Sequence, residues 1–312
     1  MFKKISAGIF LLTLTALTIS LGFYSSFSEE RLSSLVSNSQ IANTAVGPIE
    51  YEIVEAQGPT ILFLHGTPGG YDGPKSFPGF RVLAPSRPGY LRTPLDVGES
   101  PVEQAHAYAA LLDTLDIDSV LAVGVSGGGP SAISFAAMYP EKTTALIAIE
   151  AVSQPDIDPP SLPAFLGNDF SMWAVLSLMK NVLGSEGIIE FMVPNPVNRA
   201  LILDDAAKVT TVSDMVFSMW PISQRKIGMD NDFKQFSNMM LPNVDTTVPT
   251  LIIHGTEDIN VPFAQSEKLL KQIPHAKFHV VEMGDHMMPF SHAEEVAAAL
   301  ADFLEPLNIK IP

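Results

Sequence analysis

The sequence has no cysteine among its 312 residues, and its basic residues are scarce, with 18 lysines and arginines against 34 aspartates and glutamates. Without cysteine, the chain forms no disulfide, no thiolate nucleophile and no cysteine-ligated zinc site. It also lacks the residue to which a lipoprotein anchor is attached. The formal net charge of −16 argues against nucleic-acid partners, because phosphate binding depends on clustered lysine and arginine.

Charged residues are few as well, at 17% of the chain, whereas hydrophobic residues make up 46%. This composition supplies a large buried core and disfavours intrinsic disorder. At about 150 residues per domain the length would suit two domains, but single α/β domains often run longer.

The N-terminus combines two basic residues with a long uncharged run. Lys3 and Lys4 precede residues 5–28, which carry no charge. This order is typical of a secretory signal peptide, and about 20 apolar residues also suffice to span a membrane. We therefore predict export to the periplasm or the outside, with residues 1–28 acting as a signal peptide or as a membrane anchor. The polar, serine-rich residues 29–45 are predicted to be a linker.

Beyond this linker, short apolar runs that suit strands alternate with helical patterns. The predicted strands are residues 49–54, 60–64, 80–84, 119–123, 144–149, 249–254 and 277–282, and the predicted helices are 100–115, 128–139, 264–273 and 291–304. Two of these helices begin with a capping-box pattern, Ser100 with Glu103 and Ser291 with Glu294. The alternation predicts an α/β fold with a mostly parallel central sheet and helices on both faces.

Residues 153–245 break this alternation, because they show helical periodicity with several proline breaks and no convincing strand. They hold eight of the thirteen methionines and both tryptophans. We predict an inserted helical lid here, between core segments 46–152 and 246–312. The methionines would offer a deformable apolar pocket, although filling the lid's own core is the simpler interpretation.

Ser126 lies between a predicted strand and a predicted helix, in the run Gly124-Val125-Ser126-Gly127-Gly128. A sharp strand-to-helix turn exposes such a serine hydroxyl and leaves no room for a Cβ at Gly124 or Gly128. The N-terminus of the following helix favours developing negative charge beside the serine. A phosphate-binding loop is the alternative, but the P-loop lysine is absent. We predict that Ser126 is a nucleophile.

An acid and a histidine follow two later strands. Asp258 comes after the strand 249–254, and His286 comes after the strand 277–282. Since the carboxyl ends of parallel strands meet at one edge of a sheet, the chain order serine, aspartate, histidine suits a catalytic triad. His286 would take the proton of Ser126, and Asp258 would orient the imidazole and stabilise its charged form.

Other residues compete for these roles. Glu257 is the neighbouring acid and Glu150, at the end of the strand 144–149, is a more remote one, whereas Asp285 is expected to be a solvated loop residue. Among the seven histidines, His292 is the main rival base. His254 is expected to have a structural role, hydrogen-bonded in the core.

A glycine-rich turn, His65-Gly66-Thr67-Pro68-Gly69-Gly70, follows the strand 60–64. Such a turn brings a backbone N–H to the substrate oxygen, so we predict an oxyanion hole formed by the N–H groups of Thr67 and Gly127. His65 is expected to brace the loop by hydrogen bonding. No metal and no organic cofactor is implied.

Together with Ser86-Arg87-Pro88-Gly89-Tyr90, these ordered motifs resemble those of the α/β-hydrolase superfamily over about residues 49–305. The resemblance implies an α/β-hydrolase fold with an inserted helical lid, and a serine hydrolase activity. Families with an aspartate nucleophile, such as epoxide hydrolases and haloalkane dehalogenases, differ at Ser126. Proline iminopeptidases share a similar loop but usually carry tryptophan where this chain has Gly127.

These features predict hydrolysis of a small or moderately hydrophobic carboxylic ester through an acyl-enzyme. A proline-iminopeptidase-like aminopeptidase or amidase acting on short substrates is the first alternative. It would need a charged group in the lid to hold an amino terminus, for which Glu186, Glu190, Asp204 and Asp205 are candidates. A non-catalytic binding protein on a hydrolase fold is the second. The sequence does not fix the oligomeric state.

Overall fold

The computed structural model describes residues 2–155, 157, 164–245 and 247–309. Its central sheet has eight strands in the order β1-β2-β4-β3-β5-β6-β7-β8. Their bounds are β1 Gln40–Thr44, β2 Gly47–Val54, β3 Thr60–Leu64, β4 Arg81–Pro85, β5 Val120–Val125, β6 Thr143–Ile149, β7 Thr250–Gly255 and β8 Lys277–Val281. Strand β2 pairs antiparallel with β1 and β4, and the remaining pairs are parallel.

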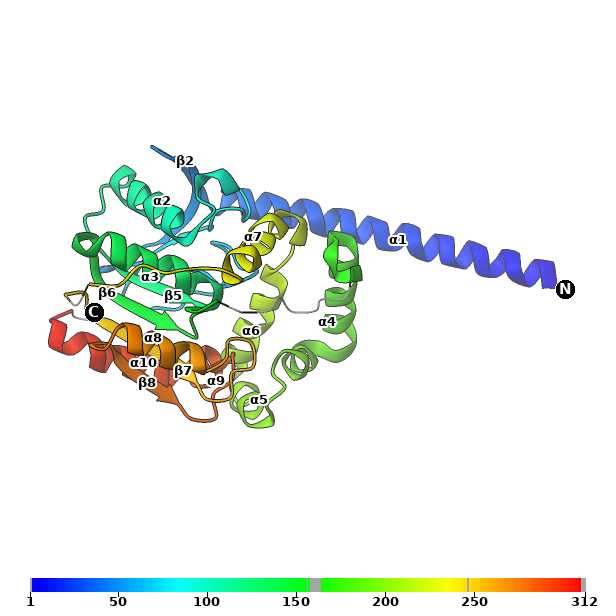
Figure 1. The fold of residues 1–312 in the computed structure, drawn as a ribbon. Helices are drawn as coiled ribbons and strands as arrows, with labels where there is room; N and C mark the ends of the chain where they lie inside the picture. Colours follow the sequence, from blue (N-terminus) through cyan, green and yellow to red (C-terminus); the bar gives the residue numbers. More distant parts are fainter. Residues whose placement is uncertain (1, 156, 158–163, 246, 310–312) are drawn as a thin grey trace.

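Alternate residues of the inner strands enter two separate cores, one on each face of the sheet. In β3, Leu62 and Leu64 lie in one core, whereas Ile61 and Phe63 lie in the other. Helices α2 (Pro101–Thr114), α3 (Gly129–Met138) and α8 (Ala264–Gln272) cover the first face, and α9 (Met288–Ser291) and α10 (Ala293–Leu304) cover the second (Figure 1). Because both faces are covered, the inner strands β3 and β5 consist almost entirely of apolar residues. The predicted layered α/β architecture is confirmed.

One of the two predicted capping boxes is present and the other is wrong. At the start of α2, the Glu103 N–H donates to Ser100 Oγ at 3.2 Å, and the Ser100 N–H donates to the Glu103 carboxylate at 2.8 Å. Ser291 instead ends α9, and its hydroxyl donates to the Met287 carbonyl at 3.3 Å. That hydroxyl serves the preceding turn, so α10 begins after His292 without a side-chain cap.

In the described part of the chain between β6 and β7 lie the α-helices α4 (Asp169–Met192), α5 (Pro196–Leu203), α6 (Ala206–Ser218) and α7 (Lys226–Phe236). We call the described part of residues 153–245 the lid. Residues 156 and 158–163 of the predicted lid lie outside the described residues, as do residues 246 and 310–312 of the predicted core. Four lid methionines pack in apolar clusters between the lid helices: Met172, Met179, Met192 and Met215. For these four, the simpler interpretation as lid core holds.

The N-terminal segment is a single helix, α1 (Phe2–Ser37). The predicted linker at residues 29–45 is therefore wrong, because residues 29–37 continue α1 and residues 40–44 form the edge strand β1. An edge strand is largely solvated and needs few apolar side chains, which is why β1 has no apolar run. Helix α1 leaves the body of the molecule beside α4 and projects away from it (Figure 1).

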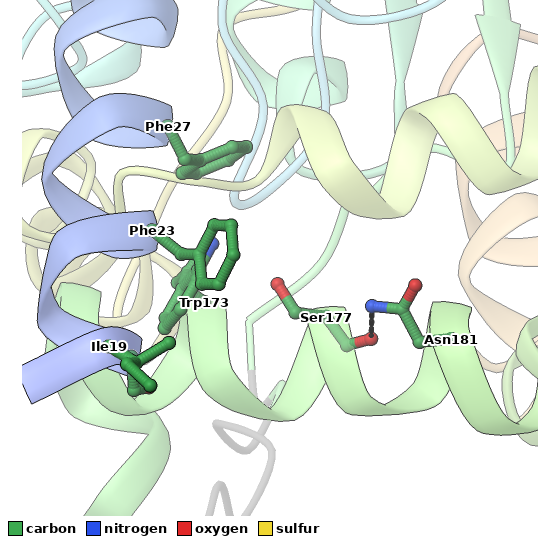
Figure 2. Close-up of a pocket in the computed structure, with 7 residues that line it drawn as sticks. Ile19, Phe23, Phe27, Trp173, Ser177 and Asn181 are labelled. Carbon is green, nitrogen blue, oxygen red and sulfur yellow. Dashed lines mark hydrogen bonds between the residues drawn. The ribbon is translucent and has the colours of Figure 1, made fainter. Parts of the chain in front are cut away.

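The second half of α1 packs against the lid. Tyr24 lies 5.2 Å from Phe170 between ring centroids, and Phe27 lies 4.9 Å from Trp220. A pocket of about 730 Å³ opens beside this contact, between α1 and α4 (Figure 2); it is lined by Ile19, Ser20, Phe23, Phe27, Trp173, Ser177 and Asn181. Among the described residues, no helix combines the length and the apolarity that a membrane span needs. Export stays a prediction.

Candidate active site

Ser126 sits in the turn between β5 and α3 with a φ of 51°, in the left-handed region that residues other than glycine rarely adopt. The turn is tight on both sides of the serine. A Cβ built on Gly124 would lie 2.6 Å from the Ala132 Cβ, and one on Gly128 would lie 2.1 Å from the Leu64 carbonyl oxygen. Neither position accepts a side chain, so the two glycines permit the strained turn that presents the serine hydroxyl.

Three of the predicted site residues form one hydrogen-bonded chain. His286 Nε2 lies 3.1 Å from Ser126 Oγ, and His286 Nδ1 lies 2.7 Å from Asp258 Oδ2. The other carboxylate oxygen, Asp258 Oδ1, accepts from the backbone N–H groups of Asn260 and Val261, both at 2.9 Å. The three side chains come from the turns that follow β5, β7 and β8, so the sheet brings together residues 160 positions apart. This geometry suits proton transfer from the serine to the imidazole.

Glu150 is a second buried acid beside the same histidine. It follows β6 with a φ of 47°, and its Oε2 lies 3.7 Å from His286 Nδ1. Burial raises the pKa of Glu150 well above its ordinary value, which favours the neutral form of this carboxyl. Glu150, Asp258 and His286 are close enough to share a metal ion, but the direct 2.7 Å hydrogen bond between the last two leaves no room for one between them.

Asp258 remains the charged partner of the histidine. Its burial opposes ionisation, but hydrogen bonds from His254 and His286 outweigh this effect and lower the pKa of Asp258 below its ordinary value. For His286, burial lowers the pKa, whereas the carboxyl groups of Glu150 and Asp258 raise it above the ordinary value. Of these two acids, Asp258 makes the direct 2.7 Å hydrogen bond to His286 Nδ1, whereas Glu150 Oε2 lies 3.7 Å from that nitrogen. The imidazolium that forms during proton transfer is thereby stabilised.

The competing residues lie elsewhere or are engaged. His254 is buried, with Nδ1 bonded to Ser266 Oγ at 2.6 Å and Nε2 to the Val261 carbonyl at 2.8 Å, as expected for a structural histidine. His292 Nδ1 is bonded to the neighbouring Ser291 hydroxyl at 2.9 Å, and Glu257 is exposed.

The expectation that Asp285 is solvated is wrong. Its side chain is buried and accepts from the Met287 N–H at 3.0 Å. The turn leads at once into the short helix α9, whose Met288 N–H donates to the Asp285 carbonyl at 2.9 Å. A four-residue helix of this kind leaves no periodic signal in a sequence.

The loop after β3 lies directly against the nucleophile turn. A Cβ built on Gly66 would lie 3.1 Å from the Ser126 Cβ, and one on Gly127 would lie 3.3 Å from the Thr67 nitrogen. The two predicted oxyanion donors are thus neighbours. His65 braces this loop: its Nδ1 lies 2.8 Å from the Gly66 carbonyl, and its Nε2 accepts from the Arg87 N–H at 3.0 Å. Burial and the Arg87 charge hold the pKa of His65 well below its ordinary value, so its ring is neutral.

One buried acid beside this loop was missed by the sequence reasoning. Asp232, in the lid helix α7, accepts hydrogen bonds from Thr67, Arg87 and Tyr90. The motif that carries Arg87 and Tyr90 was recognised without a role. Nothing in the sequence around Asp232 distinguishes it from the exposed acids of the lid, because its partners are 142 to 165 positions away.

A family model for the α/β-hydrolase family matches residues 61–299. The chain belongs to the α/β-hydrolase family. Among its relatives in this family, an uncharacterised hydrolase, YcgS, from Bacillus subtilis (strain 168) is 27% identical over 83% of this chain and 95% of its own length. A 2-hydroxy-6-oxo-6-phenylhexa-2,4-dienoate hydrolase from Burkholderia cepacia is 27% identical over 80% of this chain and 88% of its own length.

Solved structures agree with this assignment. An α/β-hydrolase fold protein from Nakamurella multipartita superposes with a TM-score of 0.75 at 29% identity, covering 85% of this chain and 98% of its own. A thermophilic esterase from Thermogutta terrifontis has a TM-score of 0.59 at 22% identity, covering 86% of this chain and 98% of its own, and shows the shared fold alone. Membership of this family identifies the protein as an enzyme of the hydrolase class.

Proposed function

We propose that this hydrolase cleaves a carboxylic ester through an acyl-enzyme on Ser126. One observation carries the proposal: the continuous hydrogen-bonded chain from Ser126 Oγ through His286 to Asp258. The contact of Thr67 with Gly127 beside the serine supports an oxyanion hole at the same point. Next to the base, Met287 packs with apolar lid residues, which favours a small or moderately hydrophobic substrate.

The reaction follows from these positions. His286 Nε2 takes the proton of Ser126 Oγ as the oxygen attacks the ester carbonyl carbon. The N–H groups of Thr67 and Gly127 donate to the resulting oxyanion. The imidazolium then gives its proton to the leaving alkoxide oxygen, and the C–O bond breaks to leave an acyl-serine. A water molecule, deprotonated by His286, attacks the acyl carbon. The imidazolium then returns this proton to Ser126 Oγ as the bond between the acyl carbon and Oγ breaks, which releases the carboxylic acid and the free serine.

The aminopeptidase alternative has less support. Its candidate acids in the lid, Glu186, Glu190, Asp204 and Asp205, are all exposed. Two of them are engaged at helix ends: Asp205 caps α6 and Asp204 ends α5. An exposed carboxylate attracts an ammonium group only weakly, so none of these acids makes a good site for a substrate amino terminus.

Carbon–carbon bond hydrolysis is a second candidate, because a relative is named for a dienoate substrate. Such a substrate carries a carboxylate that needs a cation. The two arginines beside the 65–70 loop are each paired with an aspartate, Arg87 with Asp232 and Arg225 with Asp72. Neither is free to hold a substrate carboxylate, which favours a neutral ester.

The decisive experiment combines active-site labelling with a substrate panel. A fluorophosphonate probe is expected to label the wild-type protein, and the Ser126→Ala variant is expected to lose both labelling and hydrolysis. Labelling that survives the substitution would show that Ser126 is not the nucleophile. The panel compares p-nitrophenyl esters of graded acyl length with prolyl arylamides and a dienoate ketone. Faster turnover of either of the last two would replace the ester proposal, and stoichiometric ligand retention without turnover would favour a binding protein.

We further propose that the N-terminal segment directs export. Lys3 and Lys4 before an uncharged run support this location. N-terminal sequencing of the protein from fractionated cells tests it. Recovery of the full-length chain in the cytoplasmic fraction would contradict the proposal.

A further inference from the structure

Asp232 links the lid to the loop that forms the proposed oxyanion hole. It lies in the lid helix α7 and is only 3% exposed. Its Oδ2 accepts from Thr67 Oγ1, from Tyr90 Oη at 2.5 Å and from Arg87 Nη2 at 2.5 Å, and its Oδ1 accepts from Arg87 Nη1 at 2.8 Å. All three donor residues belong to the core, in the loops that follow β3 and β4.

Thr67 is the partner through which this contact reaches the reaction. Its hydroxyl donates to Asp232, so that proton is committed and the group left for a substrate oxygen is the Thr67 N–H. The same residue touches the nucleophile turn, since a Cβ built on Gly127 would lie 2.3 Å from Thr67 Oγ1. Asp232 therefore holds by its side chain a residue whose backbone nitrogen lies beside Gly127, the residue that follows Ser126.

The position of Asp232 is itself fixed by close packing one helical turn earlier. The Gly228 N–H donates to the Gly89 carbonyl at 2.9 Å. A Cβ built on Gly228 would lie 2.2 Å from the Tyr90 ring, so α7 touches this turn directly. This packing of α7 against the turn after β4 thus fixes the position of the Asp232 carboxylate relative to Thr67.

Arg87 ties the network to the base of the same loop. Its Nε donates to the His65 carbonyl at 2.8 Å, and its backbone N–H donates to His65 Nε2 at 3.0 Å. The loop is thereby held at His65 by Arg87 and at Thr67 by Asp232. Two fixed points two residues apart leave the intervening backbone little freedom.

We propose that Asp232 is a positioning residue, which aligns the Thr67 N–H toward the substrate oxyanion and makes the oxyanion hole depend on a seated lid. This inference rests on the proposed ester hydrolysis. A preorganised donor contributes most in the transition state and little to ground-state binding. Loss of the alignment should therefore lower kcat and leave KM nearly unchanged.

The test uses the full-length protein and substitutions at Thr67, because Asp232 variants leave Arg87 buried without its partner and endanger folding. Thr67→Val keeps the backbone N–H and the shape but removes the hydroxyl that Asp232 holds. We expect kcat on a p-nitrophenyl ester to fall at least about 10-fold, by loosening of one oxyanion donor, with KM within about twofold. The rate of fluorophosphonate labelling should fall in parallel, since phosphonylation passes through a similar oxyanion.

Two matched variants distinguish a positioning role of the hydrogen bond between Thr67 and Asp232 from a contribution to stability alone. Thr67→Ser restores the hydroxyl and should recover at least half of the wild-type kcat. Tyr90→Phe removes another hydrogen bond to the same carboxylate and the longer 3.4 Å contact of Tyr90 Oη with Thr67 Oγ1, but it keeps the Thr67 hydroxyl and its bond to Asp232. Its kcat should stay within about threefold of wild type while its thermal midpoint falls as much as that of Thr67→Val. An unchanged kcat in Thr67→Val, or an equal loss in Tyr90→Phe, would overturn the inference.

Failure of the inference and failure of the proposed function give different results. If the wild-type protein is not labelled in a Ser126-dependent way, the ester proposal itself falls. If labelling and hydrolysis depend on Ser126 but Thr67→Val behaves as wild type, only the positioning role is lost.

Discussion

Two buried aspartates, Asp258 and Asp232, contact residues around the nucleophile, and their partners are of different kinds. Asp258 pairs with His286, whose side chain is 19% exposed and changes its charge in the proposed reaction. Asp232 pairs with Arg87, whose side chain is 1% exposed and whose guanidinium stays charged. Burial and pairing alone therefore do not define a catalytic acid. What defines it is a partner that titrates and reaches the substrate.

The largest expected effect falls on the first aspartate. Asp258→Asn keeps the shape but leaves His286 without an anionic partner, so we expect kcat to fall about 10⁴-fold, measured on a p-nitrophenyl ester. Glu257→Gln is the matched control, since Glu257 is exposed, and it should behave as wild type. A loss of less than tenfold in Asp258→Asn would assign the role to another acid, with Glu150 as the nearest.

The pair of Asp232 with Arg87 is expected to contribute to the stability of the fold. Arg87→Met removes the cation and leaves the Asp232 charge buried, so we expect the free energy of unfolding to fall by about 3–5 kcal/mol in urea denaturation. Arg81→Met serves as the control, because Arg81 pairs with Glu55, whose side chain is 70% exposed, and such pairs contribute about 0–1 kcal/mol. Equal losses in the two variants would remove the distinction between the buried and the surface pair.

The two acids beside His286 can be separated by pH. A base must be neutral to accept a proton, so kcat/KM should rise with pH as His286 deprotonates. Because its pKa is raised, the midpoint of this rise should lie above the ordinary imidazole value of about 6.5. The measurement is kcat/KM on a neutral ester between about pH 5 and about pH 10.

Glu150→Gln provides the control for this profile. Because burial raises the pKa of Glu150 and favours its neutral form, its replacement by an uncharged amide should leave the midpoint nearly unchanged. A large downward shift would show instead that Glu150 is ionised and shares the role of Asp258.

The smallest effect concerns the contact between α1 and the lid. Phe27 is half-buried against Trp220, so Phe27→Ala should lower the free energy of unfolding by about 1–2 kcal/mol, less than the full core value. Phe23→Ala is the control, because Phe23 is 68% exposed. Urea denaturation of both variants checks the prediction, and indistinguishable midpoints would argue that α1 contributes nothing to the lid.

The two aspartates also differ in whether their roles could be predicted from the sequence. Ser126, Asp258 and His286 each follow a buried strand, and parallel strands bring such turns to one edge, so local patterns sufficed to bring these residues together. Asp232 could not be recognised, because its significance comes from contacts across more than 140 residues. The burial of Asp285 and the edge strand β1 were missed for a related reason. A four-residue helix and a five-residue polar strand have too few residues for periodicity to detect.

The contact between α1 and the lid also gives the molecule a built-in spectroscopic reporter. Its only two tryptophans, Trp173 and Trp220, both touch the aromatic rings of α1. Tryptophan fluorescence therefore originates at the contact between α1 and the lid. None of it comes from the sheet or from the turns around Ser126. Emission will follow the seating of the helix on the lid while an ester assay follows the chemistry, so the two events can be timed independently in the same unlabelled sample.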